Sequence, residues 1–318
     1  MTRRLVDGWK NYWFRPAPLL DIAVVRIIIV GYQLHFLWRH NFPGLLSRQA
    51  RLPDALYDPL AVVRLLVAPL SGPVRPSEEA LLIVFWATVA LGCLALVGLL
   101  TNATLGFFAI GNLFMQGYLY SFGDYHHGEG LVMIALVALA LGPSGRLLSL
   151  DSILRRWREG PRVRRSVSDE ILDAESEFAR WPLLLIRWVI ALAYLSAAYL
   201  KLRPAGLAWA NGHTLKYYVI RDGLRLDIDI ALWLADQHWL TVVLSWFTLL
   251  WEGSFFLVLV FPALALVYVP LGVALHMGIH VMMRATFFGF LACYSVFVPW
   301  RALIQRLRQR VGESGSVV

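Results

Sequence analysis

Residues 80–100 read ALLIVFWATVALGCLALVGLL, an unbroken apolar run without a charged side chain. A helix of about 20 apolar residues is needed to cross the roughly 30 Å hydrocarbon core of a bilayer, so this segment predicts a transmembrane helix. The whole chain has a similar composition, with 58% hydrophobic and 16% charged residues among 318. Soluble domains carry about a quarter charged residues. The sequence therefore predicts a membrane protein and argues against a water-soluble enzyme.

Seven other windows reach or approach the same length. The full set is 19–38, 80–100, 103–122, 129–143, 182–202, 240–261, 263–282 and 285–300. The stretch 240–300 is compatible with two long spans or three, and we take three because Pro262 and Arg284 are natural breaks. We expect an all-α integral membrane protein, a bundle of about eight transmembrane helices forming one domain over residues 19–300.

The basic residues predict the orientation of this bundle. With the N-terminal segment 1–18 in the cytoplasm, most of the 29 Lys and Arg residues lie on the cytoplasmic side. They gather in that segment, in the loop 144–181 and in the basic tail 301–318, as the positive-inside rule requires. An even number of spans places both termini in the cytoplasm and the long loops 39–79 and 203–239 outside. The expected location is a bacterial cytoplasmic (inner) membrane, crossed several times.

The distribution of basic residues along the chain also indicates which kind of partner the protein binds. Basic residues separate apolar runs instead of forming one continuous basic face, so the expected partner is the lipid bilayer and not a nucleic acid. Cys93 and Cys293 lie far apart in apolar runs, which predicts neither a disulfide framework nor a cysteine zinc site.

In this topology all eight histidines fall on the outer side. They are His35, His40, His126, His127, His213, His238, His276 and His280. Asp124, Glu129, Lys201 and Arg284 are predicted at the same level, and charges within a membrane usually face a cavity or a partner. One interpretation is a polar cavity that opens outward; the other is that histidine is tolerated wherever water enters.

Lys201 is the candidate that stands out, because it ends a turn of small and apolar residues at 197–200. A desolvated lysine loses the hydration of its charged form and can act as a base or nucleophile. A lysine that extends its ammonium group to the outer headgroups needs no such chemistry. Glu252 lies midway along a predicted span, where it could pair with Arg187 or Arg26, carry a proton, or take a direct role.

His276 and His280 are spaced i, i+4, so both imidazoles face one side of a helix. That spacing suits a metal, but no Glu follows His276 to complete an H-E-x-x-H pattern, and no metal is predicted. Hydrogen bonding and proton relay are the better uses of these imidazoles. Nucleophile-elbow, phosphate-loop and dinucleotide motifs are absent from the sequence.

Several short motifs resemble the HTTM family, which includes the membrane part of vitamin K-dependent gamma-glutamyl carboxylase. They are YLYSFGDYHH at 118–127 followed by LGPS at 141–144, YLSAAYLKL at 194–202 followed by WANG at 209–212, and WE at 251–252 followed by the His276/His280 helix. The resemblance covers roughly residues 9–300.

The resemblance implies a specific chemistry. Lys201 matches the lysine base that deprotonates vitamin K hydroquinone, and His127 matches the histidine that stabilises the developing anion. Asp124, His126, Trp209, Glu252, His276, His280 and Arg284 are then expected around the quinol. The implied cofactor is vitamin K hydroquinone or a related quinol, and the implied activity is oxygen-dependent deprotonation or carboxylation, a lyase or oxidoreductase reaction. A peptide or protein substrate would bind at the outer face. The chain lacks the carboxylase's large lumenal region, which puts a propeptide-bearing substrate in doubt.

Two other functional classes are compatible with the sequence. The first is a non-catalytic membrane protein with a lipid-binding, toxin-immunity or export-helper role that retains the fold. The second is a transporter, although neither paired broken helices nor an inverted repeat is evident.

Overall fold

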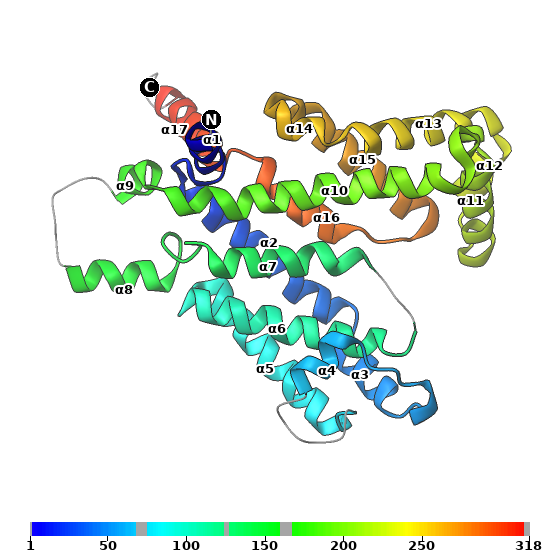
Figure 1. Ribbon diagram of the computed structural model, residues 1–318, viewed down its shortest axis with the longest axis horizontal. Coiled ribbons are helices and arrows are strands. Elements are labelled where there is room, and N and C mark those ends of the chain that lie inside the picture. Colours follow the sequence, from blue (N-terminus) through cyan, green and yellow to red (C-terminus); the bar gives the residue numbers. More distant parts are fainter. Residues whose placement is uncertain (1, 68–74, 124–126, 160–166, 315–318) are drawn as a thin grey trace. The chain divides into compact units, whose positions relative to one another are not determined.

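Helices make up 84% of the residues that the structure describes. The computed structural model describes residues 2–67, 75–123, 127–159 and 167–314 (Figure 1). Within these residues the strands are limited to one short antiparallel pair, β1 (Ala17–Pro18) and β2 (Glu175–Ser176). The all-α class expected from the sequence is confirmed.

Five helical segments among the described residues are long and apolar enough to cross a membrane. They are Leu19–Arg39, Glu78–Val97, Glu177–Asn211, His238–Val260 and Pro262–Met283. A sixth is obtained if Phe288–Phe297 and Trp300–Arg310, which meet at a 71° bend, count as one broken span. Several long apolar helices are what a multi-pass integral membrane protein requires.

The eight predicted windows all contain helix, but not all of these helices qualify as spans by length and composition. The helix α6 (Thr101–Tyr120) has the length but carries Asn102, Asn112 and Gln116, which lower its hydropathy. The helix α7 (Gly130–Leu141) is strongly apolar but short. The window 285–300 is divided between α16 (Phe288–Cys293) and η7 (Tyr294–Phe297). The structure therefore supports five or six spans, fewer than the eight expected.

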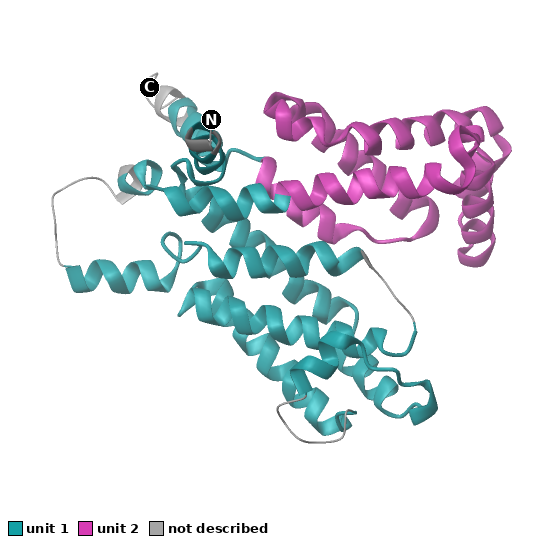
Figure 2. Ribbon diagram, in the orientation of Figure 1, with its two compact units in different colours: residues 1–186, 298–318 teal, residues 187–297 magenta. Residues whose placement is uncertain are grey.

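The chain divides into two compact units (Figure 2). Unit 1 comprises residues 1–186 and 298–318, and unit 2 comprises residues 187–297. The long helix α10 (Arg180–Ala205) begins in unit 1 and continues through unit 2.

Unit 1 is built around α2 (Leu19–Arg39), α5 (Glu78–Val97), α6 and α7. Its other elements are α1 (Thr2–Phe14), α3 (Phe42–Ala50), η1 (Asp54–Leu56), α4 (Ala61–Val67), η3 (His127–Glu129), α8 (Leu150–Glu159), α9 (Val167–Asp173), η4 (Glu177–Ala179) and α17 (Trp300–Ser314). The Ser77 hydroxyl caps α5 by accepting from the Ala80 amide, and Gly98 ends the helix with φ 75°. A Cβ atom at Gly92 would lie 2.6 Å from the Phe108 ring, so glycine is what allows α5 to approach α6 this closely.

The interior of unit 1 holds polar groups that pair with each other. The Gln33 amide on α2 donates to Asn112 Oδ1 on α6 at 2.7 Å, and both residues are fully buried. Asn112 donates in turn to the Phe108 carbonyl. The Tyr32 hydroxyl donates to Glu129, just before α7, at 3.0 Å. These bonds join α2 to its neighbours in a region where water cannot replace them.

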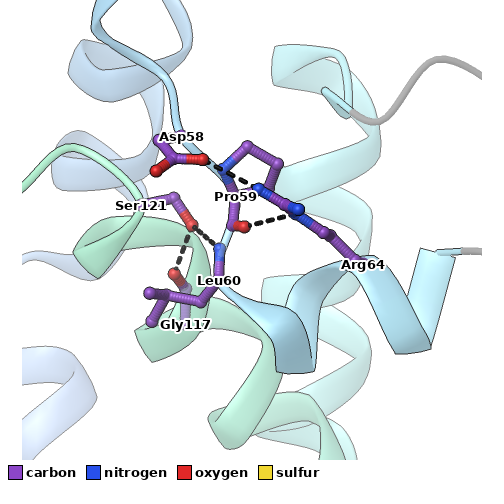
Figure 3. Close-up of polar contacts among 6 residues, drawn as sticks. All are labelled: Asp58, Pro59, Leu60, Arg64, Gly117 and Ser121. Atoms are coloured by element: carbon purple, nitrogen blue, oxygen red, sulfur yellow. Dashed lines mark hydrogen bonds and ion pairs between the residues drawn. The ribbon is translucent and has the colours of Figure 1, made fainter.

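The described part of the predicted outer loop 39–79 contains three short helices, and its middle is tied to the end of α6 (Figure 3). The Ser121 hydroxyl donates to the Gly117 carbonyl and accepts from the Leu60 amide, while the Asp58 amide donates to the Ser121 carbonyl. Arg64 pairs with Asp58 at 2.8 Å and donates to the Pro59 carbonyl. The loop is thereby held against unit 1 before α4 begins.

Unit 2 continues from α10 through a compact set of helices. These are η5 (Gly206–Asn211), α11 (His213–Leu226), α12 (Asp229–Asp236), α13 (His238–Ser254), α14 (Leu257–Val260), η6 (Pro262–Leu264), α15 (Ala265–Met283), α16 and η7. Pro262 opens η6 and Arg284 ends α15 with φ 54°, so both breaks occur at the expected residues. The predicted outer loop 203–239 contains η5 and a helical hairpin of α11 and α12, which packs around Val219 and Ala231.

Candidate functional site

Lys201 and Glu252 form an ion pair inside unit 2. The Lys201 Nζ lies 2.9 Å from Glu252 Oε1 and 2.6 Å from Oε2, so the amine contacts both carboxylate oxygens. The Lys201 side chain is 24% exposed and the Glu252 side chain 10%. The expected lone, dehydrated amine is therefore one half of a partly buried pair that joins α10 to α13.

Aromatic and small residues surround this pair. The Lys201 Nζ lies 5.5 Å from the centre of the Trp209 ring on η5, within the range of a cation–π contact. Ala198, Ala210 and Leu249 form a small buried cluster, and Trp209 packs against it. The small side chains are what allow α10, η5 and α13 to approach closely, which brings the charged groups together in an apolar setting.

The predicted partners of Glu252 were wrong. Arg187 donates to the Val296 carbonyl, 2.9 Å from its Nε, and its guanidinium lies over the Phe297 ring. Arg26 belongs to unit 1, where it donates to the Leu148 carbonyl. The sequence of an apolar segment does not predict which basic residue will pair with an acidic residue inside it, because the pairing depends on which helices pack together.

A second polar cluster joins three elements of unit 2. The Tyr194 hydroxyl on α10 lies 2.7 Å from His276 Nε2 on α15 and also hydrogen-bonds the Tyr294 hydroxyl on η7. All three side chains are buried. Tyr194 and Lys201 are seven residues apart on α10, which places both on one helix face about 10 Å apart along the axis.

Aromatic rings enclose this second cluster. Trp251, Phe255 and Phe290 lie with their ring centres 4.6, 4.9 and 5.5 Å from that of Tyr194. His276 Nε2 is engaged with Tyr194, but His276 Nδ1 is buried and has no hydrogen-bond partner among the described residues. A buried imidazole nitrogen without a partner is a candidate contact for a polar group of a ligand.

The other predicted residues of unit 2 lie outside these contacts. His280 sits one turn after His276 on α15, its ring centre is 5.0 Å from that of Phe288, and its Nδ1 also lacks a partner among the described residues. Arg284 is exposed and caps α15 through its backbone amide. His213 and His238, expected in the outer loop, stack with their ring centres 4.7 Å apart.

The remaining predicted residues belong to unit 1. Asp124 and His126 lie outside the described residues, and for His127 only the backbone, the first residue of η3, is described. Lys201 belongs to unit 2. The expected pairing of Lys201 with His127 therefore stays a prediction.

Sequence reasoning quoted Tyr194 within a motif but gave it no role, and it overlooked Tyr294. One signal for Tyr194 was available, because its seven-residue spacing from Lys201 places the two on the same helix face. No comparable signal exists for Tyr294, which lies 100 residues further along the chain.

The site places titratable side chains next to each other in apolar surroundings, an arrangement suited to proton exchange. Lys201 and Glu252 are placed to pass a proton between nitrogen and oxygen, and Tyr194 links an imidazole to a second phenol. Among the described residues no group of three or more His, Cys, Asp and Glu side chains is arranged to hold a metal ion.

The sequence matches no family model, no curated protein and no solved structure.

Proposed function

We propose that the protein is an HTTM-like integral membrane protein that binds a quinol-like lipid in unit 2 and exchanges a proton with its ring hydroxyl through Lys201. The observation that carries the proposal is the contact of the Lys201 amine with both oxygens of Glu252, in partly dehydrated surroundings beside Trp209. A surface lysine needs no such partner, whereas an amine that must gain and lose a proton within a membrane does.

Glu252 is the proposed acceptor of the proton that Lys201 must lose. An ammonium group cannot act as a base, so Lys201 must first become neutral. At 2.6 Å from Nζ, Glu252 Oε2 is placed to take that proton, which leaves a neutral amine and a neutral acid. In a medium of low dielectric constant a neutral pair competes well with a charged one. Glu252 is thus a positioning and proton-accepting residue in the proposed reaction.

The aromatic and hydrogen-bonding side chains of unit 2 are what support a quinol as the proposed ligand. Trp209, Trp251 and Phe290 offer aromatic faces near the two polar clusters, and the unpartnered His276 Nδ1 offers a hydrogen-bonding position for a ring oxygen. When bound, a quinol of the vitamin K hydroquinone type supplies a ring hydroxyl acidic enough for an amine base, and its reaction with oxygen is the expected chemistry. The assisting role that the family resemblance implies for His127 stays a prediction, and a peptide or protein substrate is proposed at the outer face.

The proposed topology is the eight-span arrangement with both termini in the cytoplasm of a bacterial inner membrane. It includes α6, α7 and the α16–η7 segment as spans. Polar side chains of α6 and η7 hydrogen-bond to other helices, as Asn112 does to Gln33 and Tyr294 does to Tyr194, so they do not have to face lipid. Cysteines placed singly at Arg155 and Lys216 test it, with Cys93 and Cys293 replaced by serine. An impermeant maleimide added to intact spheroplasts should label position 216 and not position 155.

The direct test of function is binding and turnover of a quinol by the purified protein in nanodiscs. We expect wild-type protein to bind a short-chain naphthoquinol and to oxidise it with oxygen, and Lys201→Ala to lower the rate at least tenfold. Lys216→Ala on α11 is the matched control, since it also removes a lysine from unit 2. Equal rates for wild type and Lys201→Ala would remove Lys201 from the mechanism.

One observation favours a second candidate, a non-catalytic protein with a lipid-binding, toxin-immunity or export-helper role. The Lys201–Glu252 pair also works as a cross-brace between α10 and α13. In that case the double variant Lys201→Met/Glu252→Leu should fold and keep its cellular function. Under the proposed function the same variant should fold but bind quinol without oxidising it. The genes next to this one offer an inexpensive second criterion, since a toxin gene favours the immunity role.

A further inference from the structure

The helix α8 exposes an apolar stripe with arginines beside it. Its sequence is LDSILRRWRE, and its apolar residues Leu150, Ile153, Leu154 and Trp157 are spaced i, i+3, i+4 and i+7, which places them on one face. All four are exposed, and Trp157 is 79% exposed. Ten helical residues span about 15 Å, too short to cross a bilayer. An exposed apolar face on so short a helix suits the surface of a membrane.

The charged residues of α8 are arranged around this stripe. At 100° per residue, Arg158 and Arg156 flank the apolar face, and Arg155 lies on the opposite side. The Arg156 guanidinium approaches Glu170 of α9 at 3.8 Å, and the two side chains are 35% and 57% exposed. Arg158 thus borders the stripe where a long side chain can reach headgroups while its stem covers apolar surface.

The start of α8 is fixed to the rest of unit 1. The Asp151 carboxylate accepts from the Leu100 amide at 2.8 Å and from the Thr101 amide and hydroxyl at 2.7 Å each, and it caps α6. The Asp151 amide donates back to the Gly98 carbonyl at 3.0 Å. The position of α8 is therefore coupled to the turn between α5 and α6.

No described helix packs extensively along α8, which extends from the body of unit 1 in Figure 1. We propose that α8 lies in the interface of the membrane, with Trp157 and Ile153 among the acyl chains and Arg158 on the phosphate of an anionic phospholipid. The charge of the arginines is what selects lipid as the occupant, because an apolar stripe flanked by cations complements an anionic bilayer surface. Through Asp151 this contact anchors the α5–α6 turn at the same surface.

The depth of α8 is tested with nitroxide labels on the full-length protein in vesicles of phosphatidylcholine and phosphatidylglycerol. Cys93 and Cys293 are first replaced by serine, and single cysteines are introduced as Ile153→Cys, Trp157→Cys and, as the matched control, Arg155→Cys. All three positions are exposed, so the labels leave the packing of unit 1 intact. Oxygen, which partitions into lipid, and a polar nickel chelate serve as the two relaxation agents.

The expected result is a reversal between the two faces. Labels at 153 and 157 should be relaxed more by oxygen, and the label at 155 more by nickel. Nickel accessibility at 157 equal to that at 155 would mean a solvated helix and overturn the proposal. Shielding of 153 and 157 from both agents would mean that protein covers the stripe, which would overturn it as well.

The preference for anionic lipid is tested separately. A bimane fluorophore on Trp157→Cys should be quenched more by brominated phosphatidylglycerol than by brominated phosphatidylcholine, and high salt should reduce the difference. Arg158→Gln should lower the preference by up to about fivefold, the equivalent of about 1 kcal/mol per arginine near an anionic surface. Arg155→Gln should lower it less. Equal quenching by the two lipids would show that α8 does not select anionic headgroups.

Discussion

The two units bury polar side chains in different ways. In unit 1 the buried pair between α2 and α6 consists of two neutral amides, Gln33 and Asn112. In unit 2 the pair between α10 and α13 is charged, Lys201 with Glu252. The same face of α10 carries Tyr194, whose hydroxyl bonds both His276 and Tyr294. Both arrangements satisfy groups that an apolar environment would otherwise penalise. Amides hold helices together without exchanging protons, whereas every member of the unit 2 clusters can gain or lose one. Unit 1 also holds a titratable pair, Tyr32 with Glu129, but the partly buried amine of Lys201 belongs to unit 2, which is why we place the function there.

Breaking the charged pair should produce the largest effect on stability. Lys201→Met leaves Glu252 without its cation, and we expect a loss of about 3 kcal/mol in unfolding free energy, the lower end of the range for one-sided removal of a buried pair, because this pair is only partly buried. The double variant Lys201→Met/Glu252→Leu should recover most of this loss. Thermal unfolding in detergent micelles measures both, and additive losses in the double variant would contradict direct pairing.

Removing the central phenol should have the next largest effect. Tyr194→Phe deprives both His276 and Tyr294 of a buried hydrogen-bond partner, and we expect a loss of about 2 kcal/mol. Tyr294→Phe leaves the Tyr194–His276 bond intact and should cost about 1 kcal/mol. If the two variants unfold at the same temperature, Tyr194 does not bridge the other two groups.

Breaking the amide pair of unit 1 should lower the unfolding free energy by a smaller amount. Asn112→Leu leaves the Gln33 amide buried and unpaired, for which we expect a loss of about 1.5 kcal/mol. Gln33→Leu/Asn112→Leu should be close to wild type in stability. Because amides do not titrate, both differences should stay constant between about pH 5 and 9, and quinol binding should be unaffected. Reduced quinol binding in the double variant would undermine the division of roles between the units.

The smallest effect concerns Asp151, a charged group at the edge of unit 1. Burial tends to raise the pKa of its carboxyl, but hydrogen bonds from Thr101 and from the Leu100 amide hold that pKa below its usual value. A lowered folded-state pKa contributes stability above the unfolded value of about 3.9, and this stability is lost as the pH falls through the folded value. Asp151→Asn should therefore cost about 1 kcal/mol near neutral pH and progressively less below about pH 4. Melting curves measured across this range provide the check.

The sequence could predict the helices because, within a membrane, the backbone N–H and C=O groups of each apolar run must hydrogen-bond to each other in the same segment. It also located breaks at Pro262 and Arg284, where the ring of proline and a charged residue interrupt an apolar helix. Length and composition support only five or six spans, because α6 is long but rich in amides and α7 is short, so the count of eight stays a proposal. The sequence identified Lys201 from its local surroundings and assigned Glu252 the wrong partners.

Length and apolar composition by themselves determined that this chain is a helical membrane protein with a lysine in an unusual place. Only the tertiary structure decided what that lysine meets. Glu252 follows Lys201 by 51 residues and Tyr294 follows Tyr194 by 100, and no local pattern connects them. Helical periodicity determines which face of its own helix a side chain occupies, but the partner depends on which helices pack together, and small residues such as Ala198 and Ala210 allow that close approach.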